Sequence, residues 1–266
     1  MRAAANAFTI VGSEVLVSVS QQYTRELRDE LGYLPTWLPI TRVSPGGVGR
    51  IVDYQYAHVG TLADFGIPYE IEDGDAKADF EYQSAGSVSA AVKLAGEAPA
   101  AGSTLATADA GIALDFSKEH AIVFRATGCR STRIKNQLAL GAAVLAKYQA
   151  GAWPDDLVVV TEAVSAASAT IVISSGNKAH LDLRAAGKAD AAGLHLANAE
   201  AKLQIARESN IGTKIVAEAQ LTPLMRTSGV RKRILRDAVF RSERAVPTGT
   251  GAELAFDDVE YEDYGG

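Results

Sequence analysis

The spacing of apolar residues predicts an α-helix close to the start of the chain. Within QQYTRELRDEL, the residues Tyr23, Leu27 and Leu31 recur at helical spacing, and Gly32 follows them as a stop signal. Just before this helix, the residues of Val15–Val19 alternate with polar neighbours, which predicts a short strand.

Strand patterns dominate the next part of the chain. Tyr33–Ile71 contains several prolines and the turn SPGGVGR among short apolar runs, so we expect loops and brief edge strands there. Apolar and polar positions then alternate along three segments, which predicts three strands. These segments are Val88–Leu94, Ala110–Phe116 and Ala121–Gly128.

A second helix is predicted where the hydrophobic period changes from strand-like to helical. Ser131 or Thr132 is placed to cap its start, and Gly151 is placed to end it. The face that we expect to be buried consists of Ile134, Leu138, Ala142, Leu145 and Tyr148.

A second group of strands is predicted after this helix. LVVVTEAV and ATIVISS, joined through SAAS, are expected to form two strands, and AHLDLRA, KLQIARE and GTKIVAEAQL are expected to form three more. The basic stretch Arg226–Arg244 is expected to contain a helix. Strand groups thus lie on both sides of one strong helix without regular βα alternation. We therefore predict an α+β fold with a central, twisted, largely antiparallel sheet and peripheral helices.

Composition excludes several classes of protein. The chain has 266 residues, 47% hydrophobic and 22% charged, which is typical of one or two globular domains. With 26 Lys and Arg against 32 Asp and Glu, its net charge of −6 disfavours nucleic acid as a partner. No apolar stretch approaches the roughly 18 residues of a spanning helix, and no secretory signal is recognised. A single cysteine excludes an internal disulfide, so we expect a cytoplasmic protein.

Residues that could carry out catalysis do not form a known motif. The glycine-rich turn Pro45–Arg50 lacks the Gly-Lys-Ser/Thr ending of a phosphate-binding loop. Arg130 and Arg133 lie near Cys129 and would lower its thiol pKa, but a small buried apolar role suits this residue better. The histidines are scattered, at His58, His120, His180 and His195. We expect no enzymatic activity, no cofactor and no metal site.

The end of the chain has the strongest charge asymmetry. Residues 226–244 carry seven Lys or Arg and two Asp or Glu, a local charge of +5. Residues 245–266 carry six carboxylates and no basic residue, so they account for the whole net charge of −6 and leave 0 for residues 1–244. Apolar residues are interleaved with these carboxylates. The tail therefore either docks on the core or forms a disordered, solubilising segment.

Two sets of residues are candidates for a role in such a tail. The candidate anchors against the core are Leu254, Phe256, Val259 and Tyr261. The segment before them has the composition of a flexible, protease-accessible linker. It consists of Ala245, Val246, Pro247, Thr248, Gly249, Thr250 and Gly251.

The helix QLALGAAVLAKYQAGAW running into DDLVVVTEAVSAASATIVISS resembles the gasdermin family of pore-forming proteins. In that family a helix leads into a strand and hairpin of the form (L/V)-x-VVTE-(A/V), which Leu157–Val164 matches here. LRDELGY at Leu27–Tyr33 is similar to the family's early helix. The resemblance extends from Phe80 to the end, and the short length resembles the bacterial members.

The resemblance implies a pore-forming core, 1–244, that a linker and C-terminal peptide, 245–266, hold inactive until a protease removes the peptide. It implies a cell-death effector that is cytoplasmic when inactive and at the inner membrane when activated. The implied partners are anionic lipids, an activating protease and further copies of the chain. Bacterial members often carry an acylated early cysteine, which this sequence lacks, and Cys129 is not assigned that role.

The implied lipid contacts are Arg231, Lys232, Arg233 and Arg236, with a solvated face paired with carboxylates as the alternative. Pore formation would convert strand pairs into transmembrane hairpins of a closed β-barrel. Asp79–Ala126 and Asp156–Glu208 have the required alternation, although strands of an ordinary half-buried sheet share it. The rival functions are a soluble ligand-binding or assembly module with a solubilising acidic tail, and a hydrolase with an unrecognised site.

Overall fold

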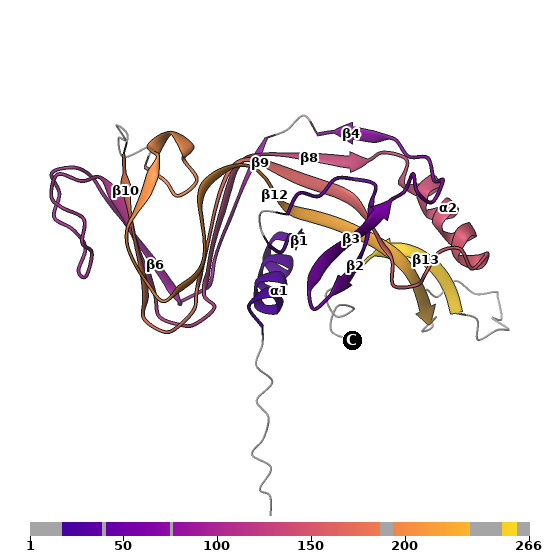
Figure 1. Cartoon of the computed structure of the whole chain (residues 1–266), viewed down its shortest axis with the longest axis horizontal. Helices are drawn as coiled ribbons and strands as arrows, with labels where there is room; N and C mark the ends of the chain where they lie inside the picture. The colour runs from indigo at the N-terminus through magenta and orange to yellow at the C-terminus, as the bar shows by residue number, and fades with distance from the viewer. Residues whose placement is uncertain (1–17, 39–40, 75–76, 187–193, 235–251, 260–266) are drawn as a thin grey trace, which may run out of the picture.

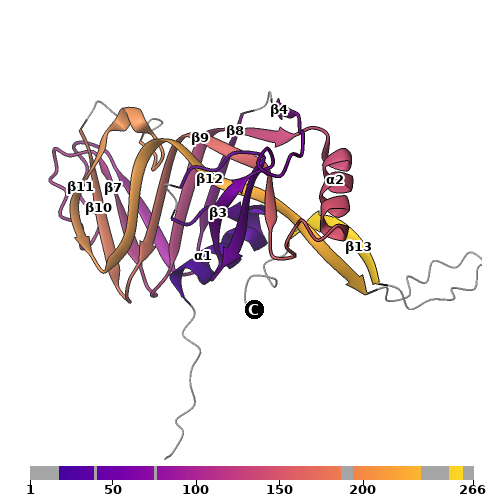
Figure 2. The same cartoon turned by 45° about the vertical axis from the view of Figure 1, so that its right-hand side comes forward.

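Two antiparallel β-sheets and two α-helices make up the part of the protein that the computed structural model describes, residues 18–38, 41–74, 77–186, 194–234 and 252–259 (Figures 1 and 2). The α+β class and the largely antiparallel sheet with peripheral helices are confirmed. In chain order the elements are α1 (Val19–Leu31), β1 (Leu34–Pro35), β2 (Gly47–Val52), β3 (Gln55–Thr61), β4 (Ile71–Asp73), β5 (Ala78–Gln83), β6 (Val88–Lys93), β7 (Gly111–Phe116), β8 (Ile122–Ile134), α2 (Gln137–Gln149), β9 (Val158–Ser174), β10 (Ala179–Ala185), a 3-10 turn (Ala199–Ala201), β11 (Leu203–Ser209), β12 (Ile211–Ile234) and β13 (Ala252–Asp258).

The nine-stranded sheet is organised around β9. β12 pairs with one side of β9, and β8 and β2 pair with the other side. β1 and β13 extend the sheet from β12, β4 and β5 from β8, and β3 from β2. The second sheet has the order β11-β10-β7-β6. It lies at one end of the molecule, and α2 and β13 lie at the other (Figure 1).

Two strands are longer than the sequence pattern predicted. The two strands expected on either side of SAAS form one strand, β9, because Ala166 and Ser168 are small enough to pack inside, with 3% and 4% exposure. β12 continues well beyond GTKIVAEAQL to a length of 24 residues. It bends at irregularities in its register, and Ala217 and Gln220 adopt left-handed φ angles of 49° and 59° there.

The first helix was predicted correctly. The Ser18 hydroxyl caps α1 by accepting a hydrogen bond from Gln21 N at 3.1 Å. Gly32 ends the helix with a φ of 70°, a conformation that glycine adopts without steric cost. Tyr23 and Leu27 are completely buried, as their spacing indicated. Val15–Val19 did not prove to be a strand over its described part, because Val19 begins α1 and residues 15–17 lie outside the described ranges.

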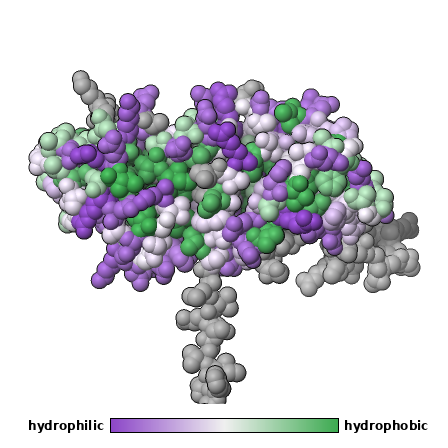
Figure 3. Space-filling view, in the orientation of Figure 1, coloured by the Kyte–Doolittle hydropathy of each residue, from purple (hydrophilic) through white to green (hydrophobic). Residues whose placement is uncertain are grey.

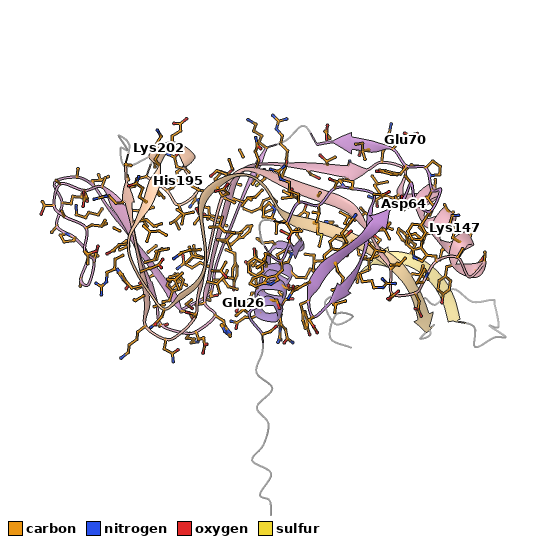
Figure 4. The ribbon with its side chains drawn as sticks, in the orientation of Figure 1. Glu26, Asp64, Glu70, Lys147, His195 and Lys202 are labelled. Carbon is orange, nitrogen blue, oxygen red and sulfur yellow. The ribbon has the colours of Figure 1, made fainter. Side chains whose placement is uncertain are left out.

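The carboxylate of Glu26 attaches α1 to the sheet. Glu26, labelled in Figure 4, accepts hydrogen bonds from Tyr82 Oη and Ser84 Oγ, both at 2.7 Å, and from Gln22 Nε2 at 2.7 Å. Tyr82 belongs to β5 and Ser84 follows it. The helix is therefore fixed to the chain that leads into the second sheet.

The start of α2 was predicted too early. Ser131 and Thr132 lie inside β8, which runs to Ile134, so neither residue caps the helix. Asn136 precedes α2, and its Oδ1 accepts a hydrogen bond from Glu70 N at 2.9 Å rather than from the helix. Pairing of β8 with β4 and β9 at this point outweighs the local capping signal.

The buried face predicted for α2 was correct only in part, because Ile134 is buried and Leu145 and Tyr148 pack against a core cluster, but Leu138 and Ala142 are exposed. Leu138 is 93% exposed, whereas Leu140, Gly141 and Val144 are buried. Apolar residues occur on every side of this helix, so their period alone did not identify the inner face. Gly151 follows the helix with a φ of 71°, as expected for a stop.

The two sheets share one apolar core where the smaller sheet meets β8 and β9. Its buried members include Ile112, Leu114, Phe116, Val123, Val172, Leu181 and Leu183. In the space-filling view, apolar residues also gather over the half of the molecule that carries this sheet (Figure 3). Two exposed apolar residues, Val92 and Ile205, lie on its edge strands β6 and β11.

Candidate regulatory site at the C-terminal strand

The C-terminal segment contributes a strand to the edge of the nine-stranded sheet. β13 pairs antiparallel with the end of β12 through seven register pairs, from Ser228 opposite Asp258 to Ile234 opposite Ala252. The helix expected within the basic stretch is wrong over 226–234, because these residues continue β12. Strand pairing explains this, since Ser228 and Gly229 pair with β13 on one side and with β9 on the other.

Phe256 is the tail residue that reaches α2. It is half-buried and packs against the apolar cluster that contains Leu140, Val144 and Val230. Gly141 of α2 lies next to it, since a Cβ added there would be in ordinary contact, 3.4 Å from both Cβ and Cδ1 of Phe256. The tail therefore packs directly against the helix.

Val259 closes the end of the ladder. Its side chain is 5% exposed, and its N–H donates to the carbonyl oxygen of Thr227 at 3.1 Å. Gly229 allows a close approach, since a Cβ there would lie 3.3 Å from Val259 Cγ2. Val259 packs with the buried cluster that includes Val158 and Met225.

Asp258 connects the tail to a polar cluster on the sheet. Its Oδ1 accepts a hydrogen bond from Ser228 Oγ at 3.2 Å, and its Oδ2 lies 3.9 Å from Arg226 Nη1. Arg226 also places Nε 3.4 Å from Glu162 Oε2 and its guanidinium carbon 4.5 Å above the ring of Tyr33. The cluster thus joins β13, β12, β9 and the chain after α1.

Glu162 lies at the centre of this cluster and is largely buried. Tyr33 Oη donates to Glu162 Oε1 at 3.2 Å, and Ser131 Oγ also donates to this carboxylate. Burial, followed by the negative charge of Glu162, raises the pKa of Tyr33, so its phenol remains a donor near neutral pH.

The predicted residues differ in how far the structure locates them. Phe256 and Val259 contact the core, and Leu254 lies in β13. Tyr261, Arg236 and the linker Ala245 to Gly251 lie outside the described residues. The backbone register elsewhere is Arg231 opposite Ala255, Lys232 opposite Leu254 and Arg233 opposite Glu253. Three candidate lipid contacts, Arg231, Lys232 and Arg233, and two candidate anchors, Leu254 and Phe256, therefore lie on the same pair of strands.

Sequence reasoning missed the polar cluster around Glu162. The available signal was a carboxylate inside the apolar run LVVVTEAV, because a charge at such a position needs a partner. The pattern did not identify Arg226 as that partner, since strand pairing between β9 and β12 brings the two together.

The structure also shows whether the thiol of Cys129 is reactive. Burial, with a smaller effect of the Asp79 charge, raises the pKa of this thiol to about 12, so its arginine neighbours do not activate it. Over the described ranges, no three His, Cys, Asp or Glu side chains are grouped to hold a metal ion. Neither described helix combines the length and the hydropathy needed to cross a bilayer.

No protein-family model matches the chain, and no curated protein matches it.

Proposed function

We propose that this protein is a membrane pore-forming effector of cell death whose C-terminal peptide holds it inactive. A protease activates it by cutting between the basic stretch and β13, and the released core oligomerises on an anionic membrane into a transmembrane β-barrel. The observation that supports this proposal is the pairing of the acidic C-terminal strand with the basic end of β12. The protein is cytoplasmic before the cut and at the inner membrane after it.

Charge gives the first reason why removal of the tail would favour membrane binding. The intact chain carries −6, and residues 1–244 carry 0. Anionic lipids attract basic residues by about 1 kcal/mol each near the surface. Four such residues, Arg231, Lys232, Arg233 and Arg236, precede the cut, and three of them are paired in register with the tail. Release of β13 would therefore leave an uncovered basic strand edge.

The energetics of docking explain how a single cut is sufficient. Burying Phe256 in part and Val259 almost fully contributes about 2–4 kcal/mol. Ordering seven residues of β13 costs on the order of 1–2 kcal/mol each, which the ladder hydrogen bonds offset only in part. The bound state then depends on the covalent tether, which holds the peptide at roughly millimolar effective concentration. A cut removes this advantage.

Two parts of the chain are candidates for membrane insertion, which we call hairpin region 1 (79–126) and hairpin region 2 (156–208). Region 1 contains most of β5, β6 and β7 with the start of β8, and region 2 contains β9, β10 and most of β11. A membrane strand needs about 9–11 residues. β9 has 17 residues, and β8, with 13, begins in region 1 and continues beyond it. In this proposal the shorter strands extend when the two regions separate.

Vesicle flotation tests the membrane step. A specific protease site is placed in the linker, and intact and cut proteins are floated with vesicles of phosphatidylglycerol and phosphatidylcholine, or of phosphatidylcholine alone. We expect only the cut protein to float, and only with the anionic vesicles. If neither form floats after the tail has dissociated, the proposal is wrong, and the alternative of a soluble ligand-binding or assembly module is favoured.

A further inference from the structure

A row of polar residues crosses the outer face of the four-stranded sheet. It consists of Ser89 on β6, Asp115 on β7, His180 on β10 and Ser209 on β11, each opposite the next in register. Asp182 lies two residues after His180 and therefore on the same face. The His180 side chain is 10% exposed and that of Asp182 is fully buried, whereas that of Asp115 is 52% exposed, so only the part of this face around His180 and Asp182 is covered.

His180 contacts a carboxylate through each ring nitrogen. Its Nδ1 lies 2.7 Å from Asp115 Oδ1, and its Nε2 lies 3.0 Å from Asp182 Oδ1. A neutral imidazole has only one N–H, so it would direct a lone pair at one of the two carboxylates. The protonated ring donates an N–H to Asp115 and lies beside Asp182 as an ion pair that lacks hydrogen-bond geometry, and both contacts favour the imidazolium. A carboxylate lies beside each nitrogen, so His180 is not placed to act as a general base.

Asp182 extends these contacts to the loop between β6 and β7. Its Oδ2 accepts hydrogen bonds from Thr104 N at 2.7 Å and from Thr104 Oγ1 at 2.8 Å. The buried Lys93 ammonium donates to the carbonyl oxygen of Thr107 in the same loop at 3.1 Å. Thr104 and Thr107 therefore attach this loop to Asp182 and Lys93 on the outer face of the sheet.

These contacts join the two hairpin regions. Asp115 and Thr104 belong to region 1, and His180 and Asp182 belong to region 2. We propose that the Asp115–His180–Asp182 bridge is a proton-dependent restraint that holds hairpin regions 1 and 2 together, so that its loss accelerates their separation once the tail has been removed. The existence of the bridge rests on the contacts above, whereas its effect on pore formation rests on the proposed function.

The charge balance explains why the restraint depends on a proton. With His180 protonated, one positive charge lies between two negative charges. When the proton leaves, two carboxylates face a neutral ring at the same distances and repel each other through a partly buried space. Other charged groups on this face or beside it are Lys93, Asp109, Lys178, Arg184 and Arg207, and His180 is the one imidazole among them.

The direction of the pH effect follows from the two bridging groups. Burial alone lowers the pKa of His180, but hydrogen bonds and charges from Asp115 and Asp182 more than offset it and raise this pKa above its ordinary value. Burial would raise the pKa of Asp182, but hydrogen bonds, first from the Thr104 backbone, keep it below its ordinary value. The stabilisation is complete below the unfolded-state histidine pKa and is lost as pH rises through the folded-state value.

Hydrogen exchange in the uncut protein tests the restraint without any membrane. Opening equilibria for peptides covering β7 and β10 are measured between pH 6 and 9, after correction for intrinsic exchange. We expect opening of the wild-type protein to increase by up to tenfold per pH unit between the unfolded-state and folded-state pKa values of His180, and to level off above the folded-state value. The His180→Gln variant should open more readily at pH 6 and show no such dependence. His58→Gln, an exposed position on β3, is the matched control and should behave as wild type.

Asp115→Asn provides a second variant that is tolerated more easily, because its side chain is 52% exposed. Loss of one carboxylate should move the pH at which opening increases to a lower value. Identical pH profiles for the wild type, His180→Gln and Asp115→Asn would overturn the restraint.

Dye release after the engineered cut then tests its consequence. Release from anionic vesicles should be several-fold faster at pH 8.5 than at pH 6 for the wild type, and fast at both pH values for His180→Gln. Release that occurs with the same rate in both proteins overturns the restraint and leaves the proposed function in place. Absence of release in every protein contradicts the proposed function, while hydrogen exchange still decides whether the bridge exists.

Discussion

Phe256 of β13 lies directly against Gly141 of α2. A Cβ at that position would lie 3.4 Å from two carbon atoms of Phe256, which is ordinary van der Waals contact. The contact joins the last strand of the fold to a helix that is distant in sequence. Phe256 is thus an apolar attachment of the tail to the cluster beside α2.

Phe256→Ala should weaken docking of the tail. Truncation of a fully buried phenylalanine costs about 3–5 kcal/mol, so a half-buried one should cost about 2 kcal/mol. That corresponds to roughly a 30-fold shift toward the undocked state. Hydrogen exchange over 252–259 should show this increase, and uncut Phe256→Ala should release dye slowly where the uncut wild type does not.

Leu138→Ala is the matched control for this change. Leu138 lies on the same helix but is 93% exposed, so its truncation should leave exchange of the tail unchanged. Equal exchange of β13 in the wild type and Phe256→Ala would contradict the role assigned to Phe256.

Asp258→Asn should have a small effect, although Asp258 makes an ionic contact with Arg226. Its side chain is 50% exposed and lies 3.9 Å from Arg226, and exposed pairs of this kind contribute about 0–1 kcal/mol. The asparagine retains an acceptor for Ser228. We expect tail exchange within about threefold of wild type, with little dependence on salt. A loss as large as that of Phe256→Ala would show that charge, not apolar burial, holds the tail.

Reversal of Arg231, Lys232, Arg233 and Arg236 to Glu should abolish binding of the cut protein to anionic vesicles. At about 1 kcal/mol for each basic residue, removal alone should reduce the partition coefficient by roughly two to three orders of magnitude at low salt. The control is a second quadruple reversal at exposed positions elsewhere. Those positions are Arg42, Lys118, Lys135 and Lys202. Equal loss of binding in both variants would indicate a general charge effect rather than a lipid-binding strand.

Cys129 should resist alkylation in the folded protein. Its thiol is 1% exposed and its pKa is raised to about 12, so almost no thiolate is present at pH 8. Iodoacetamide followed by mass spectrometry should show labelling in denaturant and almost none in buffer. Rapid labelling of the native protein would contradict the burial of this strand.

The sequence was informative where local signals and tertiary packing agree. The first helix has a capping serine, an apolar face and Gly32 as its stop, and each of these features acts on the helix locally. The paired strands β6 and β7 likewise follow simple alternation. Antiparallel strand pairs make up a large part of this fold, so the alternation of apolar and polar positions was enough to predict the fold class.

The errors arise where distant partners determine the structure. Ser131 is a good cap by composition but pairs within β8, and Leu138 fits a helical period although the core lies on the other side. A helix was expected within the basic stretch, yet neighbouring strands determine the conformation of residues 226–234, while 235–244 lie outside the described residues. His180 and Asp182 follow an ordinary strand alternation in the sequence. That pattern did not indicate that Thr104, from a distant loop, contacts Asp182.

Dye release measured before and after a single cut in the linker tests the central claim most directly. Vesicles of phosphatidylglycerol and phosphatidylcholine are loaded with a self-quenched dye, and departure of the tail is followed in parallel by gel filtration. The account predicts no release from intact protein and rapid release once the tail has left. If the tail dissociates and the cut protein is as inactive as the intact one, the C-terminal strand is not an inhibitor of pore formation.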